Sequence, residues 1–127
     1  MPLPSVLWSA ESPKRLSREE DPRFKAYWVK RWCAENAGTS EVKLIDESRA
    51  DAVTEMLAVK LEWANDWKDA IGRSLSYAVH TNKTAHIVLL LREERDRRFG
   101  VRLRSVIDYY HLPITVEEVV TWTVASE

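Results

Sequence analysis

The sequence is poor in glycine and in cysteine. Its 127 residues include three glycines and a single cysteine, Cys33. Three scattered glycines exclude a glycine-rich loop of the kind that binds phosphate through backbone N–H groups. One cysteine excludes a disulfide within the chain, and no Cys/His spacing indicates zinc. We therefore expect a protein of a reducing, cytoplasmic compartment.

Long apolar runs and an excess of one charge are missing as well. No apolar stretch approaches the roughly 20 residues of a membrane-spanning helix. The first residues, MPLPSVLWSAES, lack the basic start and the apolar run of a signal peptide. We therefore expect no secretion and no membrane partner. With 19 basic against 20 acidic residues, the net charge of -1 gives by itself no indication of nucleic acid as a ligand.

Aromatic residues, in contrast, are plentiful. Six Trp, four Tyr and two Phe supply enough buried area for one core without a disulfide or a structural metal. A chain of this length fits one domain. Residues 1–18 hold three of the five prolines and show no sustained periodicity. We predict an irregular N-terminal arm over 1–18 and a folded domain over 19–127.

Hydrophobic periodicity predicts helices and strands in the order αβββαβαβ. Asp21 is expected to cap the first helix, with Pro22 as its first residue and an end near Gly38. The later elements are strands over 41–45, 49–54 and 57–63, a helix over about 66–82, a strand over 86–91, a helix over 99–110 and an edge strand over 114–124.

The run HIVLLL at 86–91 is apolar throughout, so this strand is expected in the interior of the sheet. The helix before it predicts that it lies beside the 57–63 strand and parallel to it. The fold class is therefore α/β, with a mixed β-sheet flanked by helices.

Three charged residues on two of these strands are the candidates for chemistry. Asp51 lies on the strand over 49–54, and Lys60 and Glu62 lie two residues apart on the next strand. Because side chains alternate along a strand, Lys60 and Glu62 share one face, and both can reach a site that includes Asp51.

A longer pattern surrounds these residues. It consists of EVKL at 41–44, RADAVT at 49–54, AVKLE at 58–62, WKDAIGRSLSYA at 67–78 with Thr81 and Lys83, and HLPIT at 111–115. With these motifs the chain, from about Pro22 to Val119, resembles the PD-(D/E)XK nuclease superfamily, in particular its small stand-alone members. The helix motif from Trp67 to Tyr77 is the most specific part. The resemblance implies a restriction-endonuclease-like core and metal-dependent hydrolysis of nucleic acid.

The resemblance also implies roles for single residues. In the superfamily, an Asp and the first acid of the next strand bind Mg²⁺ or Mn²⁺, and a Lys or acid two residues further on positions the attacking water. Carried over, Asp51 is the first metal ligand. Lys60 stands in the place of the second acid, and Glu62 stands in the place of the Lys or acid that follows. Arg73 replaces the usual glutamine of the helix motif, and Asp69 replaces a glutamate.

Two interpretations follow. In the first, the protein is a metal-dependent nuclease with Asp51, Glu62 and Glu41 as ligands of Mg²⁺ or Mn²⁺, Lys60 as a catalytic helper and Arg73 near the phosphate. In the second, the fold has lost catalysis and binds nucleic acid or a protein partner. The contacts would then come from Lys60, Arg73 and the arginine-rich segment REERDRRFGVRLR at 92–104, although its interspersed acids are also typical of a solvated surface.

The remaining candidates favour structural roles. The three histidines lie at no ligand-like spacing, and the tryptophans of the helices and strands are expected in the core. The tail TVEEVVTWTVASE is typical of an apolar edge strand, which predicts association into a homodimer or with a protein partner.

Overall fold

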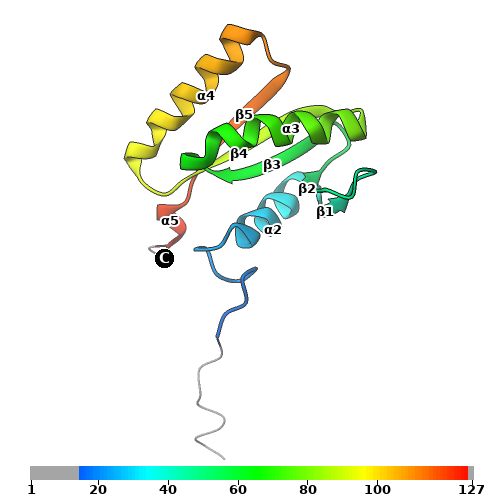
Figure 1. Ribbon diagram of the computed structural model, residues 1–127. Helices are drawn as coiled ribbons and strands as arrows, with labels where there is room; N and C mark the ends of the chain where they lie inside the picture. Colours follow the sequence, from blue (N-terminus) through cyan, green and yellow to red (C-terminus); the bar gives the residue numbers. More distant parts are fainter. Residues whose placement is uncertain (1–14, 126–127) are drawn as a thin grey trace, which may run out of the picture.

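The computed structural model describes residues 15–125 and shows a five-stranded mixed sheet with helices on both faces (Figure 1). The strands are β1 Thr39–Lys43, β2 Arg49–Val53, β3 Leu57–Trp63, β4 Thr84–Leu91 and β5 Ile114–Val120. The helices are α2 Lys25–Asn36, α3 Trp67–Thr81, α4 Arg97–Tyr110 and α5 Trp122–Ala125, with short 3₁₀ turns η1 Ala64–Asp66 and η2 Glu94–Asp96. The α/β class is confirmed. The order of the helices and strands matches the predicted one, except that α5 was not predicted. Most of the predicted N-terminal arm lies outside the described residues.

The sheet combines antiparallel and parallel pairs in the order β1-β2-β3-β4-β5. β1 pairs with β2 and β2 with β3 in antiparallel register. β3 and β4 are parallel from the pair Leu57 and Thr84 to the pair Trp63 and Leu90. β4 and β5 are parallel as well. The predicted neighbours are therefore confirmed, and β5 lies at an edge as expected.

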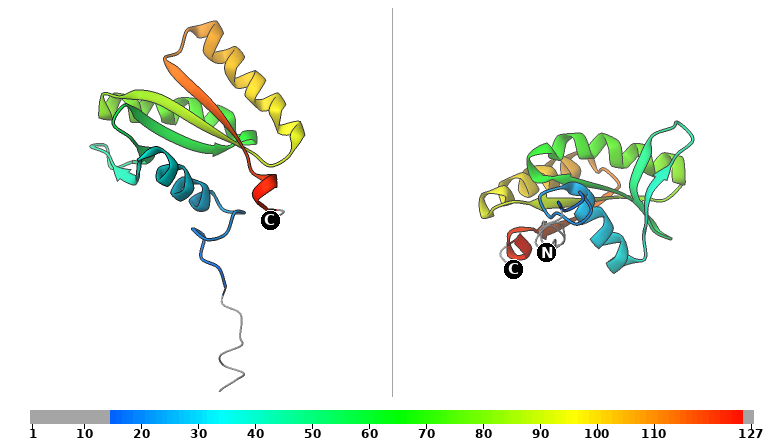
Figure 2. Two further views of the ribbon diagram at one scale, coloured as in Figure 1. Left: turned by 180° about the vertical axis from the view of Figure 1, so that it is seen from behind. Right: turned by 90° about the horizontal axis from the view of Figure 1, so that it is seen from below.

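The two faces of the sheet carry different helices (Figure 2). On β4, Ile87 and Leu89 belong to the apolar cluster that packs against α3 and α4. Val88 and Leu90, which point the other way, pack with Trp28 and Trp32 of α2. Because helices cover both faces, every residue of β4 after Thr84 is buried, which confirms an interior strand.

Most predicted boundaries lie within two residues of the observed ones, but two are further off, and each of these has a local cause. α2 begins at Lys25 instead of Pro22, because Asp21 does not cap it. The Asp21 carboxylate accepts the backbone N–H of Arg23 at 3.0 Å and also binds its guanidinium. β5 ends at Val120 instead of residue 124. There Thr121 donates its N–H and its hydroxyl to the carbonyl of Leu91, and the chain turns into α5.

The three long helices end in the same conformation without glycine. Ala37, Asn82 and His111 follow α2, α3 and α4 with φ of 53°, 54° and 54°, in the left-handed region. Each donates its N–H to a carbonyl of the preceding turn. Glycine is common at this position because a side chain is strained there, and asparagine tolerates it better than alanine or histidine does.

Candidate functional site

Strands β2 and β3 part at Asp51. They pair at Ala52 with Val59 and at Val53 with Ala58, while β3 continues to Trp63 alongside β4. Where β2 separates from β3, while it stays paired with β1, the buried Asp51 side chain lies against β3. Its Oδ2 accepts the backbone N–H of Leu61 at 2.9 Å. One carboxylate oxygen thus completes a hydrogen bond of the β3 backbone and is fixed in position by it.

Lys60 lies between the two candidate carboxylates. Its Nζ is 3.2 Å from Asp51 Oδ2 and 3.6 Å from Glu62 Oε2. The other oxygen of Glu62 accepts the backbone N–H of Trp63 at 3.1 Å. The exposed fractions of Asp51, Lys60 and Glu62 are 7%, 5% and 7%, so their charges are largely removed from water. The structure therefore brings these three sequence-predicted residues together.

A second ammonium group comes from α2. Lys25, the first residue of this helix, places Nζ 3.9 Å from Glu62 Oε1. Burial lowers the pKa of Lys25, the Asp51 carboxylate opposes this effect, and the neighbouring Lys60 ammonium adds to it. No local pattern marks Lys25 in the sequence, because its contact joins distant elements. Asp51, Lys60, Glu62 and Lys25 are called the ion-pair cluster below.

Tyr77 of α3 is buried and lies near enough to Asp51 and Lys60 to interact electrostatically with both. Burial, with the Asp51 carboxylate, raises the pKa of the Tyr77 hydroxyl. For Lys60, burial acts to lower the pKa, but the attraction of Asp51 and further neighbours outweighs it, so the pKa is raised. Lys60 is thus charged and Tyr77 neutral at neutral pH. The Lys60 ammonium then lies between the carboxyl groups of Asp51 and Glu62.

This donor set does not fit a divalent metal ion. Mg²⁺ and Mn²⁺ need several oxygen ligands and an excess of negative charge. Here the carboxylates of Asp51 and Glu62 already bind backbone N–H groups and the Lys60 ammonium. Within residues 15–125, no group of three or more His, Cys, Asp or Glu side chains is arranged to hold a metal.

Glu41, the third expected metal ligand, lies outside the ion-pair cluster. It is exposed on β1 with a φ of 53° and lines a surface pocket beside Val29 and Lys30 of α2. The predicted set of Asp51, Glu62 and Glu41 is therefore not assembled in one place. β1 and β2 keep one register on both sides of Glu41, with Ser40 opposite Ala52 and Val42 opposite Ala50, so the backbone of Glu41 faces Asp51 although its side chain is exposed.

Arg73 is engaged on its own helix. Its Nε donates to Asp69 Oδ2 at 2.8 Å, one turn earlier on α3, and both side chains are more than half exposed. The two departures from the superfamily motif in this helix therefore pair with each other. The Arg73 guanidinium also acts to lower the pKa of Tyr77, so it stands near the ion-pair cluster but is not part of it.

The arginine-rich segment is mostly helix, and several of its arginines have partners. Arg97 binds Glu94 at 2.6 Å, and Arg104 binds Glu118 of β5 at 2.8 Å. Arg98 and Arg102 lie over the Phe99 ring. The segment is therefore a solvated helix face rather than one continuous basic surface.

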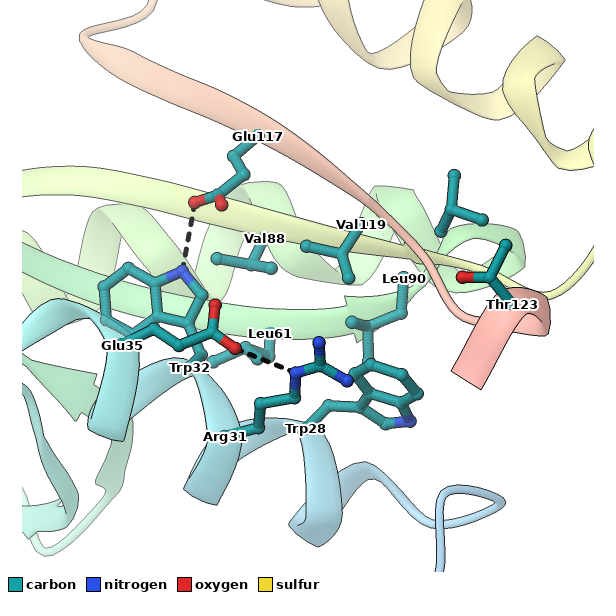
Figure 3. Close-up of a pocket in the computed structure, with 11 residues that line it drawn as sticks. Trp28, Arg31, Trp32, Glu35, Leu61, Val88, Leu90, Glu117, Val119 and Thr123 are labelled. Carbon is teal, nitrogen blue, oxygen red and sulfur yellow. Dashed lines mark hydrogen bonds and ion pairs between the residues drawn. The ribbon is translucent and has the colours of Figure 1, made fainter. Parts of the chain in front are cut away.

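Another pocket lies between α2 and β5, and several of the side chains that line it bind one another (Figure 3). Arg31 pairs with Glu35 at 2.8 Å and lies over the Trp28 ring. Trp32 donates its indole N–H to Glu117 Oε1 at 3.0 Å. That carboxylate oxygen also contacts Nε2 of His86 at 3.1 Å. Trp28 and Trp32 are buried, as expected for core residues, and His86 is held as a structural strand residue.

Comparisons of the chain with protein-family models, with curated proteins and with solved structures give no match. Among the helices of the described residues, none has the length and apolar character needed to cross a membrane. The geometry of the site is therefore the basis for a functional proposal.

Proposed function

We propose that this protein is a nuclease-like domain that binds nucleic acid without cleaving it, with Lys60 in place of the catalytic metal ion. The position of Lys60 Nζ, 3.2 Å from Asp51 Oδ2 and 3.6 Å from Glu62 Oε2, carries this proposal. The PD-(D/E)XK resemblance supplies the class of ligand, and the restriction-endonuclease-like core is part of the same proposal.

The chemistry explains why such a site does not hydrolyse a phosphodiester. In metal-dependent nucleases the ion lowers the pKa of bound water and neutralises charge on the phosphate. An ammonium group has no vacant orbital for a ligand oxygen and cannot bind and activate water in that way. A divalent ion beside Lys60 and Lys25 would also meet two positive charges at short range. The two lysines therefore stabilise the buried acids and exclude the metal.

Cationic side chains at the border of the ion-pair cluster favour a polyanionic ligand. The Lys25 side chain is 32% exposed, and that of Arg23, two residues before it, is 82% exposed. Arg73 is exposed on the side of Tyr77. These groups can contact phosphates while their own acidic partners stay bound, because guanidinium and ammonium groups have several N–H donors.

A calorimetric titration with Mn²⁺ tests the loss of the metal site. The wild-type protein is expected to give no saturable heat. Lys60→Glu is expected to create Mn²⁺ binding, since a third carboxylate would replace the ammonium between Asp51 and Glu62. Circular dichroism checks that this variant is folded. The proposal would be overturned if the wild type binds Mn²⁺ saturably and Asp51→Asn abolishes this binding. This outcome does not depend on whether Lys60→Glu is folded.

Binding to nucleic acid is tested by fluorescence anisotropy with labelled duplex and single-stranded oligonucleotides. We expect binding that weakens with rising salt and that the double variant Arg23→Ala, Lys25→Ala reduces. Lys43→Ala, which removes an exposed lysine on β1, is the matched control. If neither probe binds at low salt, nucleic acid is the wrong ligand class and a protein partner takes its place.

A further inference from the structure

Three parallel strands end together beside α5 and the start of α2 (Figure 1). A pocket lies at this edge of the sheet, called the strand-end pocket here. It is lined by Pro22, Arg23, Trp63, Arg92, Thr121 and Trp122. In open α/β sheets, ligands commonly bind at the carboxyl ends of the strands. The strand-end pocket therefore has the position of a ligand site.

The lining joins flat aromatic surface to positive charge. Trp63 closes β3 and Trp122 opens α5, and both indoles are partly exposed. The exposed guanidinium groups come from Arg23, before α2, and Arg92, directly after β4. No Asp or Glu lines the pocket. Stacking surface with adjacent cations is the composition that binds a nucleobase and its phosphate.

Arg92 is ordered by contacts that leave its charge uncompensated. Its guanidinium carbon lies 4.0 Å from the centre of the Trp63 ring, and its Nη1 donates to Asn65 Oδ1 at 2.9 Å. The backbone N–H of Arg92 binds the buried Asp96 carboxylate at 2.8 Å. Arg97 and Arg104 each pair with a glutamate, whereas within residues 15–125 no carboxylate forms an ion pair with the Arg92 guanidinium. A fixed, unpaired guanidinium is suited to bind phosphate.

Residues of the strand-end pocket are also close in sequence to residues of the ion-pair cluster. Glu62 precedes Trp63 on β3, and Lys25 follows Arg23 by two residues. A nucleic acid strand can therefore place one phosphate near Lys25 and Arg23 while the next base enters the pocket. A duplex cannot do this, because its bases are stacked within the helix.

We infer that the strand-end pocket binds an unpaired base of a single-stranded nucleic acid, with the base against Trp122 and the adjacent phosphate on Arg92. This inference rests on the proposed function and names its ligand more closely. The probes are fluorescein-labelled oligothymidylate, oligouridylate and a duplex of the same length, measured by anisotropy. The wild-type protein is expected to bind a single strand more tightly than the duplex. Trp122→Ala and Arg92→Ala are each expected to weaken single-strand binding by roughly 5- to 100-fold.

Matched controls separate the pocket from general effects. Tyr109→Ala removes an exposed aromatic side chain from the far end of α4, and Arg102→Ala removes an exposed arginine of the same helix. Both controls are expected to bind like the wild type. Because Trp122 also contacts the apolar cluster of α3 and α4, Arg92→Ala keeps the test valid if the tryptophan variant is unfolded.

The results distinguish this inference from the function on which it rests. Equal affinity for single strand and duplex, or pocket variants that bind like the controls, would overturn the inference. If duplex binding then still depends on Arg23 and Lys25, the proposed function stands without it. If no probe binds, both fail. A preference between oligothymidylate and oligouridylate assigns the ligand to DNA or RNA.

Discussion

Lys60 stands opposite Asp51 across the point where β2 and β3 separate, with Nζ 3.2 Å from Oδ2. The register of Ala52 with Val59, continued by one residue, places these two side chains on one face. Compared with the superfamily that the sequence resembles, the order of lysine and acid on β3 is reversed, and this exchange is therefore not neutral. It places the cation next to the acid of the neighbouring strand.

Removing the Lys60 charge is expected to destabilise the fold strongly. Lys60→Met leaves the buried Asp51 and Glu62 carboxylates without their common partner, and such a loss costs about 3–5 kcal/mol. Urea unfolding at neutral pH measures the free energy of unfolding. Lys43→Met, at an exposed position, is the control, with an expected change within about 0.5 kcal/mol. Equal effects of the two changes would contradict a buried ion pair.

The stability of the protein is expected to fall in alkaline solution. The pKa of Lys60 is raised in the folded state, so its contribution is complete below the ordinary lysine value of 10.5 and is lost as the pH rises through the folded pKa. Tyr77, also with a raised pKa, acts with the same sign. Lys25, with a lowered pKa, acts in the opposite direction.

Urea unfolding at a series of pH values, with wild type beside Tyr77→Phe, checks this expectation. Phenylalanine removes the titrating hydroxyl, so the variant should lose less stability than the wild type between neutral and strongly alkaline pH. Parallel pH profiles of the two proteins would show that Tyr77 does not titrate differently in the folded and unfolded states.

The thiol of Cys33 is expected to react slowly in the folded protein. Burial raises its pKa, and the Asp51 and Glu41 carboxylates act in the same direction, so the thiolate is disfavoured. The rate of reaction with a chromogenic disulfide at mildly alkaline pH measures this effect. Reaction should become fast in urea and somewhat faster in folded Asp51→Asn. A native rate equal to the rate in urea would contradict the burial of Cys33.

Association of two copies through β5 stays a prediction. The strand occupies the edge of the sheet, with Glu117 and Glu118 near its middle. Two such edges would bring like charges together, so pairing is expected to strengthen as salt screens them. Light scattering at low and high salt measures the molar mass. A strict monomer at high protein concentration in both conditions would remove the homodimer.

Local patterns predicted most of the fold and part of the site. The bounds of β3, from Leu57 to Trp63, follow from alternation along the strand, and the helix predicted over about 66–82 agrees with α3. The same alternation brought Lys60 and Glu62 to one face. The start of α2 could not be predicted, because Arg23 competes for the Asp21 carboxylate.

Contacts between distant elements account for what the sequence did not reveal. Lys25 reaches Glu62 only after α2 packs on the sheet, and the turn into α5 depends on hydrogen bonds from Thr121 to Leu91. Glu41 carries the residue type of a metal ligand, but its left-handed backbone was not predictable from its neighbours. The interpretation based on the resemblance therefore included one acid, Glu41, that the structure does not bring into the ion-pair cluster.

The residues with left-handed backbone that follow the helices are positions where the protein can be stabilised without changing the ion-pair cluster. Ala37 and His111 hold side chains in a conformation where glycine is unstrained, so Ala37→Gly and His111→Gly should each add roughly 1 kcal/mol. Changes at separate sites without shared partners usually add. A background with both changes would thus offset about 2 kcal/mol of the stability that substitutions of Lys60 are expected to remove.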